Sequence, residues 1–367
     1  MLAILVVIGC ALRSDPCRHT DHEAAVRTRA RDAALGNHRK EGGVDGTPSL
    51  TVNASAGYPA PPSMLDHPDD GVCLDLLPEL EPHFSSLLAR HKEAATKAAW
   101  SYHDYLPLDS LRTNAADHPP LSPAAYVAVE TALLTEVNLP WYTAGLAHGL
   151  ESCPAPIQEF VRVWTAEEDQ HASLLEGYLL LTGSGDHGCR SRLRKAIIAT
   201  GWQHGLTGPF EGMVYTAIQE AATRTFYLCT ARACEQEHPA LSTALRRIAR
   251  DETLHMAFYR DVVKAHLDVD ADYVLPLAGI MLRFEMPWSG AVLRDFEERR
   301  SYLGMRGVFR LSDYLDEVVQ PLWSYWGLDA CNPRRDTART AMVQLRRYRA
   351  ALRKLARNEP AVVESHS

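Results

Sequence analysis

The feature that most constrains this chain is a Glu-x-x-His spacing that occurs twice in sequence suited to helices. Glu168 and His171 form the first pair, and Glu252 and His255 form the second. Positions i and i+3 project from the same face of a helix, one turn apart. Each pair can therefore direct a carboxylate and an imidazole at one metal ion from a single rigid element.

A glutamate precedes each pair at the same distance. Glu136 lies 32 positions before Glu168, and Glu220 lies 32 positions before Glu252. The two sets of ligand-type residues are thus offset by 84 positions. A third Glu-x-x-His pattern, at 235–238, has no partner at either offset and directly precedes a proline. We interpret it as a helix boundary rather than a metal site.

Apolar periodicity predicts helices throughout the body of the chain and no strand, so the predicted fold class is all-α. The predicted helical segments are 76–99, 122–140, 155–181, 210–236, 239–267, 270–285, 289–302, 311–327 and 334–357. Pro140 is expected to end or kink the second of them. The segment 100–107 is expected to form an extended crossing.

Each half of the repeat is interpreted as a helical hairpin that carries one isolated glutamate and one Glu-x-x-His pair. Two such hairpins make a four-helix bundle, and this ligand inventory is that of ferritin-like di-iron carboxylate proteins. We therefore predict a ferritin-like four-helix bundle with additional flanking helices. The predicted metal ligands are Glu136, Glu168, His171, Glu220, Glu252 and His255.

The chemistry of these side chains favours a pair of metal ions. Four carboxylates and two neutral imidazoles carry four negative charges, which two divalent ions would neutralise, so that the cluster can be buried. Carboxylate combined with imidazole suits iron or manganese, whereas zinc more often recruits cysteine or more histidine. The choice between two irons and a mixed manganese and iron pair stays open.

Composition limits the other readings. The net charge of −8 argues against nucleic-acid binding, and no apolar run in the body of the chain reaches the roughly 18 residues of a membrane span. Eight cysteines without a C-x-x-C spacing favour a reduced, cytoplasmic setting. The apolar run at 1–12 is short and has no positive charge before it, which argues against export.

The chain is expected to hold one domain. Within residues 1–70, the segment that follows the apolar run at 1–12 is rich in polar residues, glycine and proline, and it lacks sustained periodicity. We interpret them as a disordered leader or a mis-assigned start. Residues 71–360 are expected to form a single ferritin-like di-iron domain.

A set of motifs surrounds the predicted ligands. They are Trp100 with Asp104-Tyr-Leu-Pro107, Leu134-Thr-Glu136, Leu139-Pro-x-Tyr142, Trp164-Thr-Ala-Glu-Glu-x-x-His171, Gln219-Glu220-x-x-Thr223, Asp251-Glu-x-x-His255 and Met286-Pro287. Together they resemble the soluble acyl-[acyl-carrier-protein] desaturases, namely the plant stearoyl enzymes and their actinobacterial relatives. The resemblance extends over residues 75–330.

The resemblance implies a di-iron oxidase that inserts a cis double bond into a fatty acyl chain attached to acyl carrier protein. Such an enzyme consumes O2 and two electrons from a ferredoxin, and it is a homodimer. The resemblance places two iron ions on the same six ligands that the spacing predicts.

The resemblance also implies roles for three further residues. Trp100 and Asp251 match an electron-entry route through His171, and a carboxylate on a metal-bound imidazole fixes its tautomer and orientation. Thr223, one turn beyond Glu220, matches a residue that relays a proton beside the metals. The structural alternatives are core packing for Trp100 and a hydroxyl bonded to the preceding turn for Thr223.

The sequence departs from the plant pattern beside the ligands. Asp169-Gln170 and Thr253-Leu254 replace the usual Asn-Arg and Lys-Arg, and Trp288-Ser289 stands near the place where a histidine is expected. Two alternatives therefore stay open. One is a di-iron oxygenase or tailoring oxidase acting on another carrier-bound substrate, and the other is a ferritin-type iron-handling protein.

Acyl carrier protein and ferredoxin are acidic, so an acidic chain needs local basic faces to dock them. Arg190, Arg192, Arg194 and Lys195 form one candidate cluster. The segment 334–357 carries nine basic residues and is another. Each cluster can equally be a solvated helix face.

Overall fold

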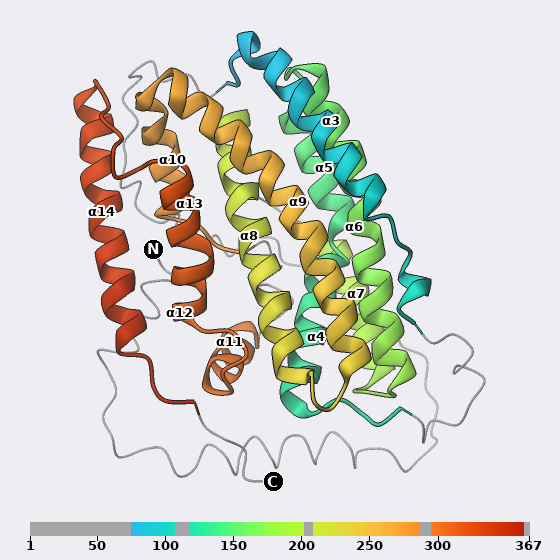
Figure 1. Cartoon of the computed structure of the whole chain (residues 1–367). Coiled ribbons are helices and arrows are strands. Elements are labelled where there is room, and N and C mark those ends of the chain that lie inside the picture. The colour runs from blue at the N-terminus through green and yellow to red at the C-terminus, as the bar shows by residue number, and fades with distance from the viewer. Residues whose placement is uncertain (1–74, 107–117, 202–207, 287–294, 363–367) are drawn as a thin grey trace, which may run out of the picture. The chain divides into compact units, whose positions relative to one another are not determined.

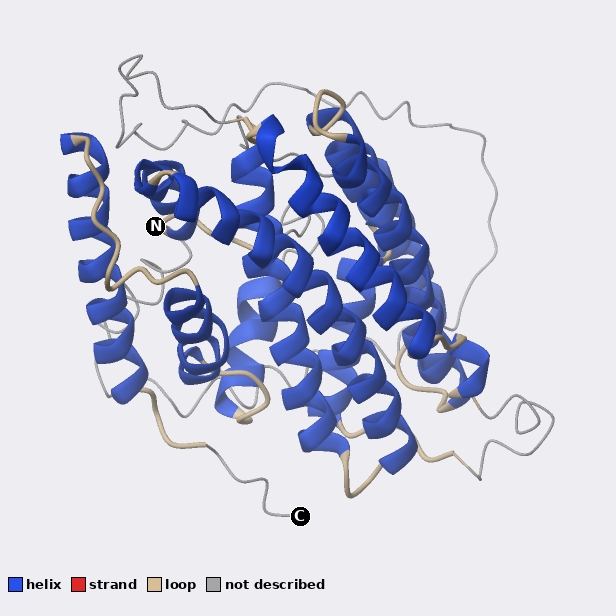
Figure 2. Ribbon diagram, turned by 45° about the horizontal axis from the view of Figure 1, so that its top comes forward, coloured by secondary structure: helices blue, strands red, loops and turns tan. Residues whose placement is uncertain are grey.

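The computed structural model describes residues 75–106, 118–201, 208–286 and 295–362, and every regular element within them is a helix (Figure 2). This confirms the all-α prediction. The longer helices are α3 (Glu81–Lys97), α4 (Pro123–Glu136), α5 (Leu139–Gly149), α6 (Ala155–Leu181), α7 (His187–Thr200), α8 (Pro209–Cys234), α9 (Pro239–Val269), α10 (Val274–Met281), α11 (Phe296–Met305) and α14 (Asp336–Arg357). The shorter elements are the helical turns η1 (Pro78–Leu80), η2 (Tyr102–Asp104), η5 (Ala271–Tyr273) and η6 (Leu315–Val319), with α12 (Leu311–Tyr314) and α13 (Gln320–Tyr325).

Four of these helices form the ferritin-like bundle that the repeat predicts (Figure 1). Helices α8 and α9 pack against each other along their length, and α4 packs against α6. Contacts of α4 with α8 and of α6 with α9 join the two pairs. The apolar faces of all four meet in one buried cluster that includes Leu133, Leu175, Tyr227 and Ile248.

Helix α6, which carries the first Glu-x-x-His pair, begins and ends where the sequence predicts. Pro156 occupies its first turn, where its missing N–H costs no intrahelical hydrogen bond. Gly183 follows its end with a φ of 59°, a left-handed conformation that glycine adopts without a Cβ clash. The Ser184 N–H bonds the Leu179 carbonyl and the Gly183 N–H bonds the Leu180 carbonyl, which completes a Schellman cap.

The flanking helices differ from the prediction in several places. The predicted helix at 122–140 ends at Glu136, and Pro140 lies in the first turn of a separate helix, α5. Helix α7 was not predicted, because its many charged residues leave it without a continuous apolar stripe; Asp186 caps it by accepting the Cys189 N–H at 2.9 Å. The expected extended crossing contains the short turn η2, which is held by a capping box between Ser101 and Asp104.

The helices outside the bundle cover its two sides. Helix α3 packs on α6 and α9, whereas α10 packs on α8 and α14. No helix in the described ranges is long and apolar enough to cross a membrane. Residues 1–70, the predicted leader, and residues 288–289 lie outside the described residues, so the division at residue 70 stays a prediction.

Candidate metal centre

The structure brings the six predicted ligands together in the centre of the bundle. Helix α4 supplies Glu136, α6 supplies Glu168 and His171, α8 supplies Glu220, and α9 supplies Glu252 and His255. Their ligand atoms form two groups of four, and the atoms within each group lie within 4.8 Å of one another.

Two glutamates belong to both groups. The first group is Glu136, Glu168, His171 and Glu252, and the second is Glu168, Glu220, Glu252 and His255. Each group thus has one terminal glutamate and one histidine of its own, and both share the carboxylates of Glu168 and Glu252. A carboxylate has two oxygens, so the shared pair is suited to bridging two metal ions. The geometry matches a two-metal site.

The cluster is enclosed by the bundle. Glu220, His171 and His255 are fully buried, and Glu136, the most exposed of the six, has a relative accessibility of 8%. Carboxylates at such positions need compensation, because moving an unpaired charge out of water is strongly unfavourable. Within the described part of the chain, several of their atoms have no hydrogen-bond donor: Glu220 Oε2 and both oxygens of Glu252. These atoms face the cluster, so the donor set fits divalent metal ions.

The charges in the cluster are strongly coupled. Burial, reinforced by neighbouring carboxylates, holds the pKa values of Glu136 and Glu220 well above the usual range. Burial also opposes ionisation of Glu168, but the two histidines outweigh it and lower its pKa. For His171 and His255 burial opposes protonation, yet the facing carboxylates raise both pKa values well above the ordinary one. Metal ions would bind here by displacing protons.

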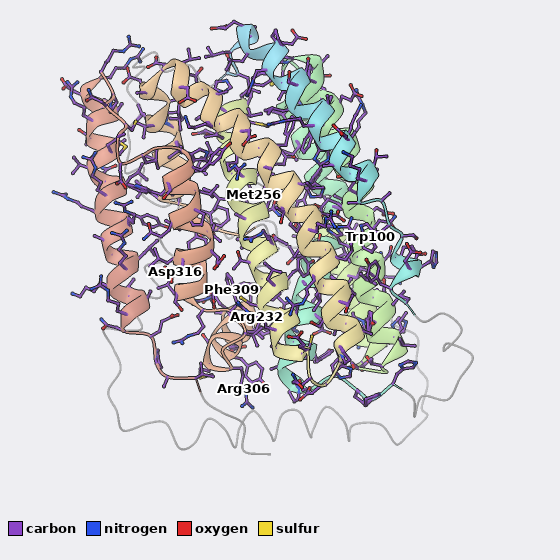
Figure 3. The ribbon with its side chains drawn as sticks, viewed as in Figure 1. Trp100, Arg232, Met256, Arg306, Phe309 and Asp316 are labelled. Carbon is purple, nitrogen blue, oxygen red and sulfur yellow. The ribbon has the colours of Figure 1, made fainter. Side chains whose placement is uncertain are left out.

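The residues that are predicted to form an electron-entry route lie together beside His171. The Trp100 Nε1–H donates to Asp251 Oδ2 at 2.6 Å, and the same oxygen lies 3.5 Å from His171 Nε2. The rings of Trp100 and His171 are stacked, with their centroids 6.4 Å apart. Arg247 donates to the other Asp251 oxygen at 2.6 Å and lies over the indole. Trp100 itself lies on the flank of the bundle, half-buried (Figure 3).

Thr223 lies on α8 one turn beyond Glu220 and is buried. Its hydroxyl donates to the Gln219 carbonyl at 3.0 Å, as the structural alternative predicts. The Gln219 amide in turn donates to the Thr223 hydroxyl at 3.3 Å. The role of Thr223 in proton transfer stays a prediction.

Sequence reasoning missed several residues that contact the ligands. The Tyr227 hydroxyl donates to Glu136 Oε1, and the Trp164 Nε1–H donates to Glu220 Oε1 at 3.0 Å. Glu167 accepts hydrogen bonds from two histidines, one of which is His255. The signal for Glu167 was present, because it lies 84 positions before Asp251. Nothing in the sequence singled out Tyr227.

One of the two predicted basic docking faces is smaller than the sequence indicates, because Arg190 is buried. Arg190 has a relative accessibility of 2%, and its guanidinium donates to the Ser184 carbonyl at 3.1 Å. The prediction that it belongs to a docking face is therefore wrong, because its charge lies under the α6–α7 turn. Arg192 and Lys195 are exposed. On α14, Arg349 lies over the Trp323 ring, and Arg346 and Arg347 are exposed.

Comparison with known proteins agrees with this geometry. A model of the fatty acid desaturase family matches residues 73–365. DesA1 of Mycobacterium tuberculosis, which carries the provisional name of an acyl-[acyl-carrier-protein] desaturase, is 32% identical over 270 residues, which cover 69% of this chain and 78% of DesA1. The chloroplastic stearoyl-[acyl-carrier-protein] 9-desaturase 1 of Arabidopsis thaliana is 25% identical over 329 residues, which cover 84% of this chain and 81% of that protein.

A solved structure has the same fold. DesA2 of Mycobacterium tuberculosis, determined by X-ray crystallography, matches with a TM-score of 0.52 at 22% identity, and the match covers 72% of this chain and 97% of DesA2. The resemblance noted in the motifs is thus confirmed over most of the described chain. The chain belongs to the fatty acid desaturase family.

Proposed function

We propose that this protein is an acyl-[acyl-carrier-protein] desaturase that introduces a cis double bond into a carrier-bound fatty acyl chain. The observation that carries the proposal is the pair of four-ligand groups sharing Glu168 and Glu252. Membership of the family supports the reaction class. We further propose a cytoplasmic homodimer that receives its electrons from a ferredoxin.

The proposed site holds two irons through Glu136, Glu168, His171, Glu220, Glu252 and His255. When bound, the irons would supply the redox chemistry that uses O2 to remove hydrogen from unactivated C–H bonds. Two hydrogens from the acyl chain, two electrons from the donor and two protons reduce one O2 to two waters. The protein contributes the enclosure, because the buried bundle core excludes bulk water from the cluster.

The residues beside His171 are proposed to admit electrons. Trp100 lies half-buried on the flank of the bundle and bonds Asp251, which in turn lies against His171. The indole thus connects the accessible side to a predicted ligand through two short contacts. Arg247 donates to the Asp251 carboxylate from the other side, and although burial opposes ionisation, His171 and Arg247 together lower the pKa of this carboxyl.

The test is a reconstitution. The purified protein is loaded with iron, its iron content is measured, and it is supplied with reduced ferredoxin, O2 and acyl carrier protein charged with a saturated chain. We expect two irons per chain and a new double bond detected by mass spectrometry of the released fatty acid. A protein that holds two irons and reduces O2 but leaves every acyl chain unchanged would contradict the desaturase proposal.

The departures from the plant motifs favour a second candidate, a di-iron oxygenase or tailoring oxidase on another carrier-bound substrate. Asp169 is exposed, and Gln170 accepts the Tyr102 N–H at 3.1 Å, so both lie outside the ligand cluster. They leave the site intact and alter its surroundings. A hydroxylated product in the same reconstitution would favour this candidate, whereas an iron load far above two per chain would favour a ferritin-type protein.

A further inference from the structure

The 84-residue repeat extends to the residue before each bridging glutamate. Glu167 precedes Glu168 as Asp251 precedes Glu252. Each of these two acids reaches the histidine of the other half of the bundle. Glu167 Oε2 lies 2.8 Å from His255 Nε2, and Asp251 Oδ2 lies 3.5 Å from the Nε2 atom of the other histidine. Both histidines thus have a carboxylate behind them.

Each acid also contacts a ring nitrogen supplied from outside the four-helix bundle. For Asp251 this partner is the Trp100 indole. For Glu167 it is His91 of α3, whose Nε2 lies 3.0 Å from Oε2 and 3.3 Å from Oε1. His91 has a relative accessibility of 5%. Its ring packs edge to face with the Phe160 ring, and the two ring centroids are 4.9 Å apart. His255 is therefore supported as the other histidine is: a carboxylate lies behind it, and a ring nitrogen lies behind the carboxylate. The ring is an imidazole here and an indole in the other half.

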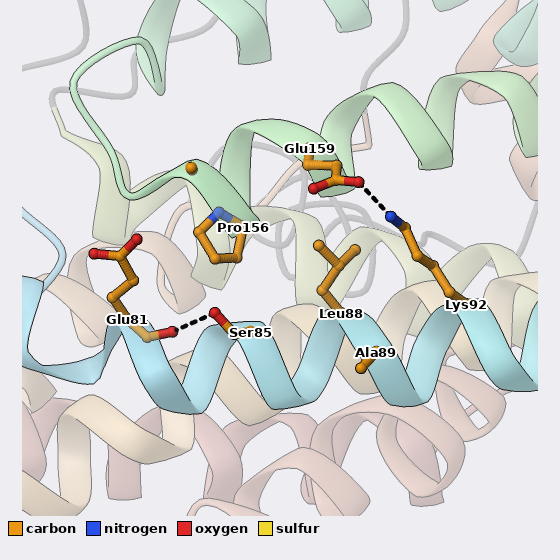
Figure 4. A pocket seen from close by; sticks show the side chains of 8 residues that line it. Glu81, Ser85, Leu88, Ala89, Lys92, Pro156 and Glu159 are labelled. Atoms are coloured by element: carbon orange, nitrogen blue, oxygen red, sulfur yellow. Dashed lines mark hydrogen bonds and ion pairs between the residues drawn. The ribbon is translucent and has the colours of Figure 1, made fainter.

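Helix α3 is held in the position that this contact requires. The side chain of Lys92, next to His91, forms an ion pair with Glu159 of α6 (Figure 4). The two helices line a hollow of about 420 Å³ whose lining includes Leu88 and Pro156 and none of the six predicted ligands. The contact of His91 with Glu167 is thus part of the packing between α3 and α6, on the side of the bundle that holds His255.

The hydrogen bond to Glu167 decides which ring nitrogen of His255 is free to bind metal. A carboxylate accepts but does not donate, so Nε2 must carry the proton. Nδ1, which lies 2.9 Å from Glu168 Oε1 and faces the cluster, then keeps its lone pair for a metal. Without Glu167, the proton can move to Nδ1 and form a hydrogen bond to Glu168. Nδ1 of His255 would then be a hydrogen-bond donor and could not bind a metal ion.

We propose that Glu167 and His91 are positioning residues that fix His255 as a ligand of the second metal ion. Glu167 sets the tautomer and orientation of His255, and His91 holds the Glu167 carboxylate in place. The inference rests on the metal site of the proposed function and is independent of the acyl substrate.

The experiment titrates metal-free protein with Co²⁺ without O2 and follows the visible absorption of bound cobalt and the number of equivalents. The wild type should bind two. Glu167→Leu should weaken one equivalent by about 10- to 100-fold and leave the other unchanged, the range expected for a carboxylate behind a metal-bound histidine. Glu167→Gln, whose amide oxygen still accepts from Nε2, should restore much of the affinity.

His91 is tested with a matched pair of variants. His91→Phe removes the donor to Glu167 and should weaken the same equivalent, although less than Glu167→Leu. His91→Gln, which can donate an amide N–H, should bind more tightly than His91→Phe. The control is Glu93→Gln, an exposed glutamate two positions later on α3 that pairs with Lys97 of the same helix, and it should titrate like the wild type.

Thermal unfolding of the metal-free variants separates positioning from a general structural role. If Glu167→Leu folds and binds both equivalents as the wild type does, the proposal is wrong, whatever its melting temperature. If that variant does not fold, Glu167→Gln and the two His91 variants decide by the order of their affinities, and equal affinities overturn the proposal.

A third metal ion is the alternative, because His91, Glu167 and His255 also lie within 4.8 Å of one another. Three cobalt equivalents in the wild type, with the third lost in His91→Phe, would overturn the positioning role. If the wild type binds two and the variants behave as expected while acyl chains stay unchanged, the positioning role holds and the desaturase function fails.

Discussion

At the scale of single residues, what distinguishes a predicted ligand from an ordinary glutamate is its surroundings. Glu220 lies on α8, and Glu235 directly follows the last residue of that helix. Glu220 is fully buried and shares its neighbourhood with Glu252, whereas Glu235 is exposed and pairs with Arg246 at 3.1 Å. Of the two, only Glu220 has a buried oxygen without a hydrogen-bond donor, and this oxygen lies among the carboxylates and imidazoles of the cluster. The Glu-x-x-His spacing is no guide here, because Glu235 has it and Glu220 does not.

We expect Glu220→Ala to abolish iron binding at the second site and, with it, turnover. The variant removes the terminal carboxylate that only this site possesses. Iron per chain, measured on the purified protein, should fall from two to one or fewer. Glu235→Ala is the matched control and should keep full iron content, and full activity in Glu220→Ala would show that the ligand assignment is wrong.

We expect Trp100→Phe to slow electron entry while leaving the iron content unchanged. Phenylalanine keeps a ring beside His171 but loses the N–H that bonds Asp251 at 2.6 Å. Stopped-flow measurement should find slower reduction of the iron-loaded variant by ferredoxin. Reduction by a small chemical reductant serves as the reference, and an equal slowing with both reductants would remove the electron-entry role.

At the scale of elements, helix ends position the ligand-bearing turns. Helix α6 holds its pair in register because the cap at Gly183 stops the helix, and Ser184 and Arg190 complete the turn that follows. Helix α8 ends at Cys234 and α9 begins at Pro239, so the turn between them is short. The ligands then face one another across four helices of fixed length.

We expect Gly183→Ala to lower the free energy of unfolding by about 1–2 kcal/mol. The reason is conformational, because φ is 59° at this position and no atom lies within 4 Å of the added Cβ. Gly149→Ala, at the end of α5, is the control: it also meets no atom within 4 Å and has no left-handed φ. Chemical denaturation of both variants should show a loss for Gly183→Ala alone.

At the scale of the whole molecule, folding and metal binding are coupled through protons. Four of the six predicted ligands have raised pKa values in the metal-free protein: Glu136, His171, Glu220 and His255. Above the ordinary histidine pKa of 6.5, the folded chain keeps protons that the unfolded chain has released. The free energy of unfolding therefore falls as pH rises through that window. Glu168, whose pKa is lowered, contributes in the opposite sense only in acid.

We expect metal-free protein to lose thermal stability as pH rises above 6.5, and metal-loaded protein to lose much less. The stabilisation by metal should thus grow with pH, because fewer protons compete with the metal and its Kd falls. It reaches about 2.7 kcal/mol per site at the pH where the free metal concentration is about 100 times the Kd. Melting curves with and without Co²⁺, recorded without O2, provide the measurement. A stabilisation that shrinks as pH rises would contradict the proton displacement.

By itself, the sequence determined the all-α class, the bounds of α6 and the six residues that meet in the bundle. These depend on local rules, namely side chains one turn apart on a helix, prolines in first turns and glycine after a helix end. Tertiary structure alone decided that Glu167 and Asp251 cross to the opposite histidines, that His91 reaches Glu167 from α3, and that Arg190 is buried. Such contacts depend on how helices are rotated and packed against one another, which no local pattern in one helix specifies.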